Sequence, residues 1–188
     1  MHTMAQISVE HNAGGIEGIC VITPTVHGDR RGYFSETYNL REMQEAGIDT
    51  VFVQDNQSSS TKGVLRGLHY QIRFPQAKLV RVIRGNVYDV AVDIRKGSAT
   101  FGKYFGIELS EENHKQLYIP RGFAHGFLVL SEYAEFCYKC DDYWHPNDEG
   151  GIIWNDKDIN IAWPKVDAPL TFSDKDMILP TMKEAVLP

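Results

Sequence analysis

The chain has 188 residues, of which 43% are hydrophobic and 23% charged, and its formal net charge is −6 at pH 7. A chain of this length forms one domain that buries about 70% of its unfolded surface. No apolar run approaches the ~18 residues of a membrane span, and an acidic chain without clustered Lys and Arg does not suit nucleic acid. We therefore expect a single domain, 1–188, that binds neither membrane nor nucleic acid.

The three cysteines, Cys20, Cys137 and Cys140, are too few and odd in number for a disulfide framework. Residues 1–15 lack the basic-then-apolar layout of a secretory signal. Together these features predict a cytoplasmic protein. Cys137 and Cys140 are three positions apart on a predicted strand, which directs their sulfurs to opposite faces, and no second Cys or His pair completes a zinc site.

Short segments rich in Val, Ile, Tyr and Phe alternate with Gly-containing turns, which is the pattern of an all-β fold. The predicted strands, in chain order, are 18–23, 32–38, 50–56, 64–71, 78–84, 86–94, 104–109, 116–119, 126–130 and 133–139. Helical signal is limited to 40–46, closed by Gly47, and to a turn that Ser110 can cap. Arg84-Gly85-Asn86 is expected to form a hairpin turn.

Many short strands with tight turns in fewer than 200 residues indicate a β-sandwich or small barrel with short peripheral helices. Residues 163–188 carry four of the eight prolines and are expected to wrap the outside of the core. No repeat, low-complexity stretch or flexible linker interrupts the chain.

Arg66 and His69 lie three residues apart in the apolar, β-prone segment 64–71. Arg keeps its charge, whereas His changes protonation near neutral pH, so the pair offers an anion clamp and a proton acceptor. Taken alone, the two residues are better explained as a solvated Arg and a hydrogen-bonded core His on an edge strand. Strict alternation directs the two side chains to opposite faces, and a bulge at Gly67 would bring them to one face.

Three further residues could line a pocket. Tyr138 lies on the inward, apolar face of strand 133–139, where its hydroxyl needs a partner. His125 is flanked by Gly122 and Gly126, which permit close backbone approach, and Lys78 opens a strand. Each also has an ordinary structural explanation, as a core Tyr, a core His and a solvated Lys.

Metal binding is the main rival to this interpretation, because β-barrels with internal histidines often hold iron or manganese. Such a site typically needs two His and one carboxylate converging on one face. His69 is followed at the next same-face position by Gln71, and His125 stands alone in its segment. We therefore expect no metal.

Several longer motifs resemble the dTDP-4-dehydrorhamnose 3,5-epimerase family, over about residues 18–176. They are, in chain order, Arg66-Gly-Leu-His69-Tyr-Gln, Lys78-Leu-Val-Arg, Asp89-Val-Ala-Val-Asp-Ile-Arg95, Ile119-Pro-Arg-Gly-Phe-Ala-His125-Gly-Phe, Glu132-Tyr-Ala-Glu-Phe-Cys-Tyr138-Lys and Ile153-Trp-Asn-Asp156. The resemblance implies a cupin-type jelly roll that uses no metal or other cofactor. It also implies a homodimer in which N-terminal strands cross to the partner subunit.

The resemblance assigns His69 as the general base, oriented by Asp176, and Tyr138 as the acid on the opposite face of the sugar. The ketone of a 4-keto-6-deoxyhexose acidifies the hydrogens on C3 and C5, and each inversion needs removal from one face and return on the other. A His with a carboxylate on its other nitrogen suits the removal. Lys78 and Arg66 match residues near the sugar and phosphates, where positive charge stabilises an enolate oxygen or holds a pyrophosphate.

The family likeness also implies a set of substrate-binding residues: Arg66, His125, Gln54, Asn56, Arg31, Phe34, Glu36, Tyr143 and Trp144. Those within 31–36 would reach in from the partner subunit. Relatives often have Tyr-Tyr where this chain has Tyr143-Trp144, and Trp keeps the stacking surface but removes a phenol oxygen.

The sequence therefore predicts an enzyme that converts dTDP-4-dehydro-6-deoxy-D-glucose to dTDP-4-dehydro-L-rhamnose, for L-rhamnose synthesis. Three alternatives stay open. A single-carbon epimerase of a related nucleotide sugar could use the same His69 and Tyr138. A non-catalytic sugar-nucleotide-binding β-sandwich is opposed by the complete set of His69, Asp176 and Tyr138, and a metal-dependent cupin oxygenase is the third.

Overall fold

The computed structural model describes residues 6–188, so residues 1–5 of the segment 1–15 discussed above lie outside it. The described chain forms, in order, β1 (Ile7–His11), a 3-10 turn (Ala13–Gly15), β2 (Cys20–Pro24), β3 (His27–Asp29), β4 (Gly32–Phe34), α1 (Leu40–Glu45), β5 (Gln54–Thr61), β6 (Leu65–Gln71), β7 (Lys78–Arg84), β8 (Asn86–Asp93), β9 (Tyr104–Ser110), β10 (Gln116–Ile119), β11 (Phe123–Val129), β12 (Tyr133–Cys140), β13 (Glu149–Gly151) and α2 (Asp174–Met177). Within residues 6–188, no helix combines the length and apolar character needed to cross a bilayer.

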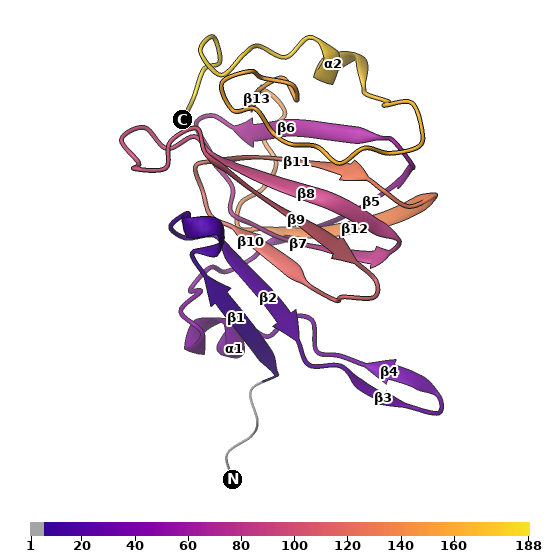
Figure 1. Ribbon diagram of the computed structural model, residues 1–188. Coiled ribbons are helices and arrows are strands. Elements are labelled where there is room, and N and C mark those ends of the chain that lie inside the picture. Colours follow the sequence, from indigo (N-terminus) through magenta and orange to yellow (C-terminus); the bar gives the residue numbers. More distant parts are fainter. Residues whose placement is uncertain (1–5) are drawn as a thin grey trace.

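Two antiparallel sheets pack face to face (Figure 1). One has six strands in the order β1-β2-β10-β7-β12-β5, and the other has five in the order β13-β6-β11-β8-β9. Strands β3 and β4 form a separate hairpin that projects away from both sheets (Figure 1). This architecture confirms the predicted all-β jelly roll with short peripheral helices.

Apolar side chains form three clusters, and two of them lie on the two faces of the five-stranded sheet. The main core lies between the sheets and includes Val80, Phe127 and Phe136. The opposite face of the five-stranded sheet packs against the C-terminal segment through residues such as Leu68 and Met182. Both faces of that sheet are therefore covered, and every residue of its strand β11 is buried.

The C-terminal segment is hydrogen-bonded to the chain around β6. The Leu65 N–H donates to the Thr171 carbonyl at 2.9 Å, and the Thr171 N–H donates to the Gly63 carbonyl at 2.9 Å. Further along, the Met182 N–H donates to Oδ2 of the buried Asp156 at 2.8 Å. In Figure 1 this yellow segment, with α2, runs across β6. These bonds fix where α2 sits relative to the sheet.

The expected hairpin at Arg84-Gly85-Asn86 is wrong. Strand β7 pairs with β10 and β12, whereas β8 pairs with β9 and β11, so the turn crosses from one sheet to the other. Gly85 has φ 74°, and its N–H donates to Glu111 Oε1 at 2.7 Å. A tight glycine turn suits either connection, because sheet membership is decided by strands distant in sequence.

Other strand limits differ from those predicted. Strand β5 spans Gln54–Thr61 instead of 50–56, because its polar residues pair with β12 over its full length despite their low β-propensity. Strand β11 begins at Phe123 instead of 126. The short strands β1, β3 and β13 were not predicted.

Gly67 forms the predicted bulge. His125 pairs with His69 and Phe127 pairs with Arg66, so two steps along β11 match three along β6. Since His125 and Phe127 lie on one face of β11, their partners Arg66 and His69 share one face of β6. Gly67 has φ 116°, and a Cβ there would lie 2.7 Å from the Gly126 Cα.

Gly67→Ala is expected to lower the free energy of unfolding more than Gly97→Ala, by at least ~1 kcal/mol. Both glycines have positive φ, but a Cβ on Gly97 meets nothing within 4 Å. The difference therefore isolates the close approach of β6 to β11. Urea denaturation of the two variants measures it, and equal losses would show that the bulge accommodates a side chain.

Candidate active site

A cavity of about 290 Å³ opens between the two sheets. Strands β5, β7 and β12 contribute from the six-stranded sheet, and β6 and β13 from the five-stranded sheet. It is lined by Gln54, Asn56, His69, Tyr70, Gln71, Gln76, Lys78, Tyr138, Cys140, Trp144 and Glu149. The structure thus brings together predicted residues from β5, β6, β7 and β12 and from the loop that follows β12.

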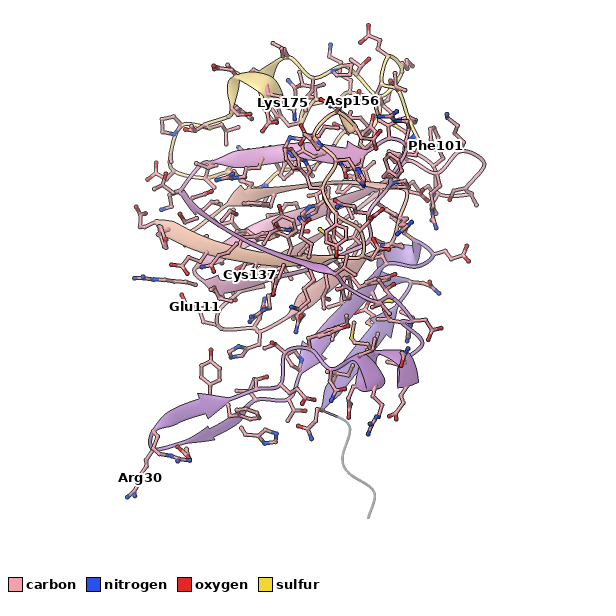
Figure 2. The ribbon with its side chains drawn as sticks, turned by 180° about the vertical axis from the view of Figure 1, so that it is seen from behind. Arg30, Phe101, Glu111, Cys137, Asp156 and Lys175 are labelled. Carbon is pink, nitrogen blue, oxygen red and sulfur yellow. The ribbon has the colours of Figure 1, made fainter. Side chains whose placement is uncertain are left out.

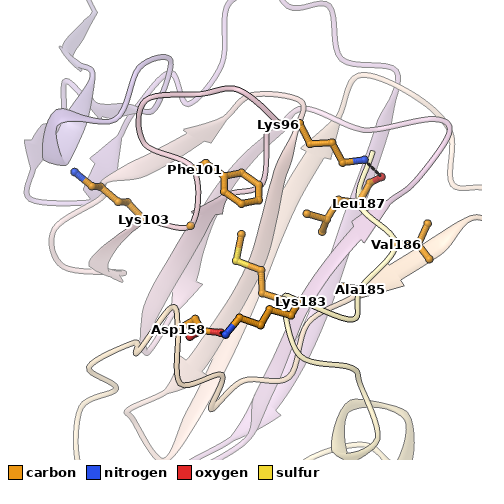
Figure 3. Close-up of a pocket in the computed structure, with 10 residues that line it drawn as sticks. Lys96, Phe101, Lys103, Asp158, Lys183, Ala185, Val186 and Leu187 are labelled. Atoms are coloured by element: carbon orange, nitrogen blue, oxygen red, sulfur yellow. Dashed lines mark hydrogen bonds and ion pairs between the residues drawn. The ribbon is translucent and has the colours of Figure 1, made fainter.

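A larger hollow of about 750 Å³ lies between the loop that follows β8 and the C-terminal segment (Figure 3). None of the predicted site residues lines it. Two of its lysines already have partners within the chain: Lys183 forms an ion pair with Asp158 at 3.0 Å, and Lys96 donates a hydrogen bond to the Leu187 carbonyl at 3.2 Å. The titratable groups suited to proton transfer are found in the smaller cavity.

His69 and Asp176 form a hydrogen-bonded pair at the cavity wall. His69 Nε2 lies 2.6 Å from Asp176 Oδ1; the Asp176 side chain is 4% exposed, whereas that of His69 is 40% exposed. With the Nε2 proton donated to the carboxylate, Nδ1 of the neutral ring carries the lone pair that can accept a proton. The pair therefore holds one imidazole tautomer at a solvent-accessible position.

Two local features place Asp176 there. Ser173 caps α2 by accepting from the Asp176 N–H at 3.1 Å, and Asp176 Oδ2 accepts from the Gly67 N–H at 3.4 Å. Burial acts to raise the pKa of the Asp176 carboxyl, but the hydrogen bonds from His69 and Gly67 outweigh it and hold that pKa below its usual value. Asp176 is thus ionised and can stabilise an imidazolium.

Tyr138 and Lys78 enter the cavity from the facing sheet. Burial raises the pKa of the Tyr138 phenol, so the group keeps its proton at neutral pH. Burial lowers the pKa of the Lys78 ammonium, although Cys140 and Asp89 act in the opposite direction. A protonated phenol and a half-buried lysine therefore lie across the cavity from the strand that carries His69.

His125 lies beside His69 as its partner across β11 and β6 and is not one of the cavity-lining residues. Its Nε2 lies 2.9 Å from Oδ2 of Asp89, and both side chains are buried. Burial lowers the pKa of His125, while Asp89 opposes that shift. Sequence reasoning gave Asp89 no role, although a carboxylate in an apolar strand signals a buried partner.

Arg66 is fixed beside the cavity by β5. Its guanidinium donates to Ser60 Oγ at 2.9 and 3.1 Å and to the Ser59 carbonyl at 3.1 Å. Arg66 is absent from the cavity lining, but its charge lowers the pKa of the Tyr138 phenol and so partly opposes the effect of burial. The guanidinium is therefore close enough to act on groups inside.

Of the two exposed aromatics predicted near the nucleotide base, only Trp144 is among the residues that line the cavity. Trp144 lines the cavity and is 54% exposed, whereas Tyr143 is exposed and does not line it. Trp144 Nε1 donates to Glu149 Oε1 at 3.2 Å, and Glu149 is ion-paired with Lys175, the neighbour of Asp176 in α2. Glu149 has no distinguishing sequence signal and was not predicted.

Arg31, Phe34 and Glu36 lie outside their own chain's cavity. They belong to or follow the β3–β4 hairpin, whose tip is marked by Arg30 in Figure 2. Arg31 pairs with Asp29 in the same hairpin, and Glu36 accepts from the Asn39 side chain at 3.0 Å. Phe34, at 67% exposed, presents apolar surface to solvent.

Among residues 6–188, no group of three or more His, Cys, Asp and Glu side chains is placed to hold a metal ion. The three cysteines are free. Cys137 is partly exposed and Cys140 is buried, in agreement with the predicted opposite orientations of their sulfurs.

Comparison with known proteins gives consistent matches. The family model for dTDP-4-dehydrorhamnose 3,5-epimerase matches residues 14–184. The dTDP-4-dehydrorhamnose 3,5-epimerase of Pseudomonas aeruginosa is 57% identical over 162 residues, which are 86% of this chain and 89% of that protein. A crystal structure of dTDP-6-deoxy-D-glucose-3,5-epimerase from Legionella pneumophila, in complex with dTDP-4-keto-L-rhamnose, is 46% identical with a TM-score of 0.92 and covers 97% of each chain. A 3'-monoepimerase from Streptomyces bikiniensis, in complex with dTDP-quinovose, is 35% identical with a TM-score of 0.85 and covers 93% of this chain and 88% of its own.

Proposed function

The chain belongs to the dTDP-4-dehydrorhamnose 3,5-epimerase family, and from that premise we propose the part that each residue of its cavity plays. It is an enzyme that converts dTDP-4-dehydro-6-deoxy-D-glucose to dTDP-4-dehydro-L-rhamnose, with a nucleotide sugar as its substrate. The observation that carries the residue assignment is the placement of the His69–Asp176 pair and Tyr138 on facing sheets around one cavity.

In the proposed mechanism, Nδ1 of His69 removes the proton from a carbon next to the ketone, and the C–H electrons move into the carbonyl to form an enolate. Lys78, in its charged form, stabilises the enolate oxygen. The Tyr138 hydroxyl returns a proton to the opposite face of that carbon, which inverts it. His69 then holds one extra proton and Tyr138 lacks one, and exchange with solvent restores both groups.

Asp176 supports this cycle by fixing the His69 tautomer and stabilising the imidazolium that forms. His125, held by Asp89, supports the position of the neighbouring His69, and Asp89 also contributes negative charge near Lys78. Gln54 and Asn56 hold the nucleotide inside the cavity, while Arg66 binds the diphosphate and Tyr143 and Trp144 stack at its mouth. These binding roles are supported by the positions of the residues in and around the cavity.

Arg31, Phe34 and Glu36 complete the nucleotide site of a partner subunit in a homodimer. Their absence from their own cavity supports this role, as does the projection of the β3–β4 hairpin away from both sheets. Tyr33 and Phe34 are 65% and 67% exposed on that hairpin, and apolar side chains gathered on a projecting element suit a protein interface.

Proton NMR of the reaction in deuterium oxide tests the proposed chemistry. Label entering both C3 and C5 of the sugar is the expected result, because one base and one acid act at both carbons. Label at a single carbon would identify a monoepimerase, the activity named for the Streptomyces bikiniensis relative. Absence of label would exclude the proton-transfer mechanism.

The dimer proposal predicts complementation between two inactive variants. His69→Ala removes the base and Arg31→Ala removes a residue donated to the partner, so a mixed dimer has one pocket with both lesions and one with neither. Activity should return when the two variants are dissociated, mixed and reassembled. No recovery, despite confirmed subunit exchange and an impaired Arg31→Ala parent, would mean that each site is built from one chain.

A further inference from the structure

Four cavity-lining residues form one continuous chain of hydrogen bonds. The main-chain N–H of Trp144 donates to Gln54 Oε1 at 3.0 Å. Gln54 Nε2 donates to Asn56 Oδ1 at 3.0 Å, and Asn56 Nδ2 donates to Cys140 Sγ at 3.8 Å. The chain therefore runs from the exposed aromatics at the cavity mouth to a buried thiol beside Lys78.

The direction of this chain is fixed at its first member. A main-chain N–H can only donate, so the Gln54 group that meets it must be the carbonyl oxygen. The other end of that amide is then a donor, which requires Asn56 to accept with its oxygen and to donate with its nitrogen. The last group must accept, and Cys140 Sγ fills that position.

Burial makes Cys140 hard to replace in this position. Cys140 is 1% exposed, so no solvent water can take the place of its sulfur as the acceptor of the hydrogen bond from Asn56 Nδ2. Burial also raises the pKa of the thiol to about 11, with the charge of Lys78 opposing the shift, so the group stays neutral and its sulfur is a weak acceptor.

We propose that Cys140 is a positioning residue for nucleotide binding, which fixes the orientation of the Asn56 and Gln54 amides by accepting the last hydrogen bond of the chain. Each amide has one N–H and one oxygen lone pair left over. Those groups face the ligand in a set order, and rotation of an amide by half a turn would exchange them. This inference rests on the proposed contact of Gln54 and Asn56 with the nucleotide.

Cys140 has a second polar neighbour, Lys78, through which it could affect catalysis instead of nucleotide binding. It pairs with Lys78 across β12 and β7 and interacts electrostatically with it. A thiol that acted through Lys78 would change kcat, the rate at which bound substrate reacts. A thiol that orients the amides would instead change the affinity for the nucleotide. The two roles are therefore separated by measuring kcat and dTDP affinity in the same variants.

The matched variants are Cys140→Ala and Cys140→Ser in the full chain, which differ by one oxygen atom. The serine hydroxyl can accept from Asn56 and the alanine cannot. Titration calorimetry with dTDP should show roughly three- to tenfold weaker binding for Cys140→Ala, the range expected for one hydrogen bond, and binding within about twofold of the parent for Cys140→Ser. Neither variant should change kcat at saturating substrate by more than about twofold.

Equal affinities for the Ala and Ser variants would overturn the inference and leave Cys140 as packing. A loss of kcat without a loss of affinity would assign Cys140 to Lys78 instead. Thermal melting establishes that both variants fold; if Cys140→Ala does not, Cys140→Val fills the space without an acceptor and should weaken dTDP binding in the same way.

Asn56→Ala separates this inference from the proposed function. If it leaves dTDP affinity unchanged, the nucleotide role of Asn56 fails and the role of Cys140 fails with it. If Asn56→Ala weakens binding but Cys140→Ala does not, only the role of Cys140 is overturned. In the double variant, Cys140→Ala should cost no affinity beyond that of Asn56→Ala, because the group it orients is gone.

Discussion

The His69→Ala variant is expected to lose at least about 10²- to 10⁴-fold in the rate of proton exchange at both C3 and C5, the range for removal of a general base. Its imidazole lines the cavity and is hydrogen-bonded to Asp176, whereas the neighbouring His125 is buried against Asp89. Affinity for dTDP should change far less, since the proposed nucleotide contacts are made by other side chains. Deuterium uptake followed by proton NMR measures the rate, and calorimetry the affinity.

His11→Ala is a suitable control for this experiment. His11 lies at the end of β1, is exposed, and contacts Cys20 outside the cavity. It should exchange protons at the parental rate. Near-parental exchange in His69→Ala would place the base elsewhere and overturn the assignment of the His69–Asp176 pair.

Tyr138→Phe should take up deuterium without forming net product. The change keeps the ring in the main core cluster, against which Tyr138 packs, and removes only the hydroxyl. Abstraction by His69 can continue, and the same imidazole can return a deuteron to the face from which the proton left. Reprotonation from the opposite face fails, so the carbon keeps its configuration.

Tyr70→Phe is the matched control, because it removes another phenol from the cavity lining. The Tyr70 hydroxyl donates to the Val186 carbonyl at 3.0 Å and is committed to the C-terminal segment. This variant should keep both deuterium uptake and turnover, as measured with a coupled reductase assay. Full turnover in Tyr138→Phe would instead make Tyr138 a packing residue.

Local pattern was enough for much of the fold. Strands β7 and β10 have the predicted limits, and the inward positions of β12 follow from simple alternation. These strand features depend on a few consecutive residues, which the sequence displays directly. The Gly67 bulge was predicted because the family resemblance requires Arg66 and His69 to share a face, which strict alternation does not allow.

Features that depend on distant partners were not predictable in this way. The turn at Gly85 joins two sheets because of strands that come both before and after it in the chain. The polar strand β5 is a strand because β12 pairs with it, and Cys140 gains its hydrogen bond from a residue 84 positions away. Asp176 was assigned only through the family resemblance, since a carboxylate near the end of the chain carries no local signal.

The 107-residue separation between His69 and Asp176 has a consequence for biosynthesis. All the strands of both sheets are synthesised before α2, so the sheets can form on the ribosome before Asp176 is available to orient His69. Contacts of such long sequence separation form late in folding because the intervening loop must first close. Catalytic competence therefore arises only after α2 has been made, and a chain that stopped between β13 and α2 would contain the strands of both sheets but lack the carboxylate that orients His69.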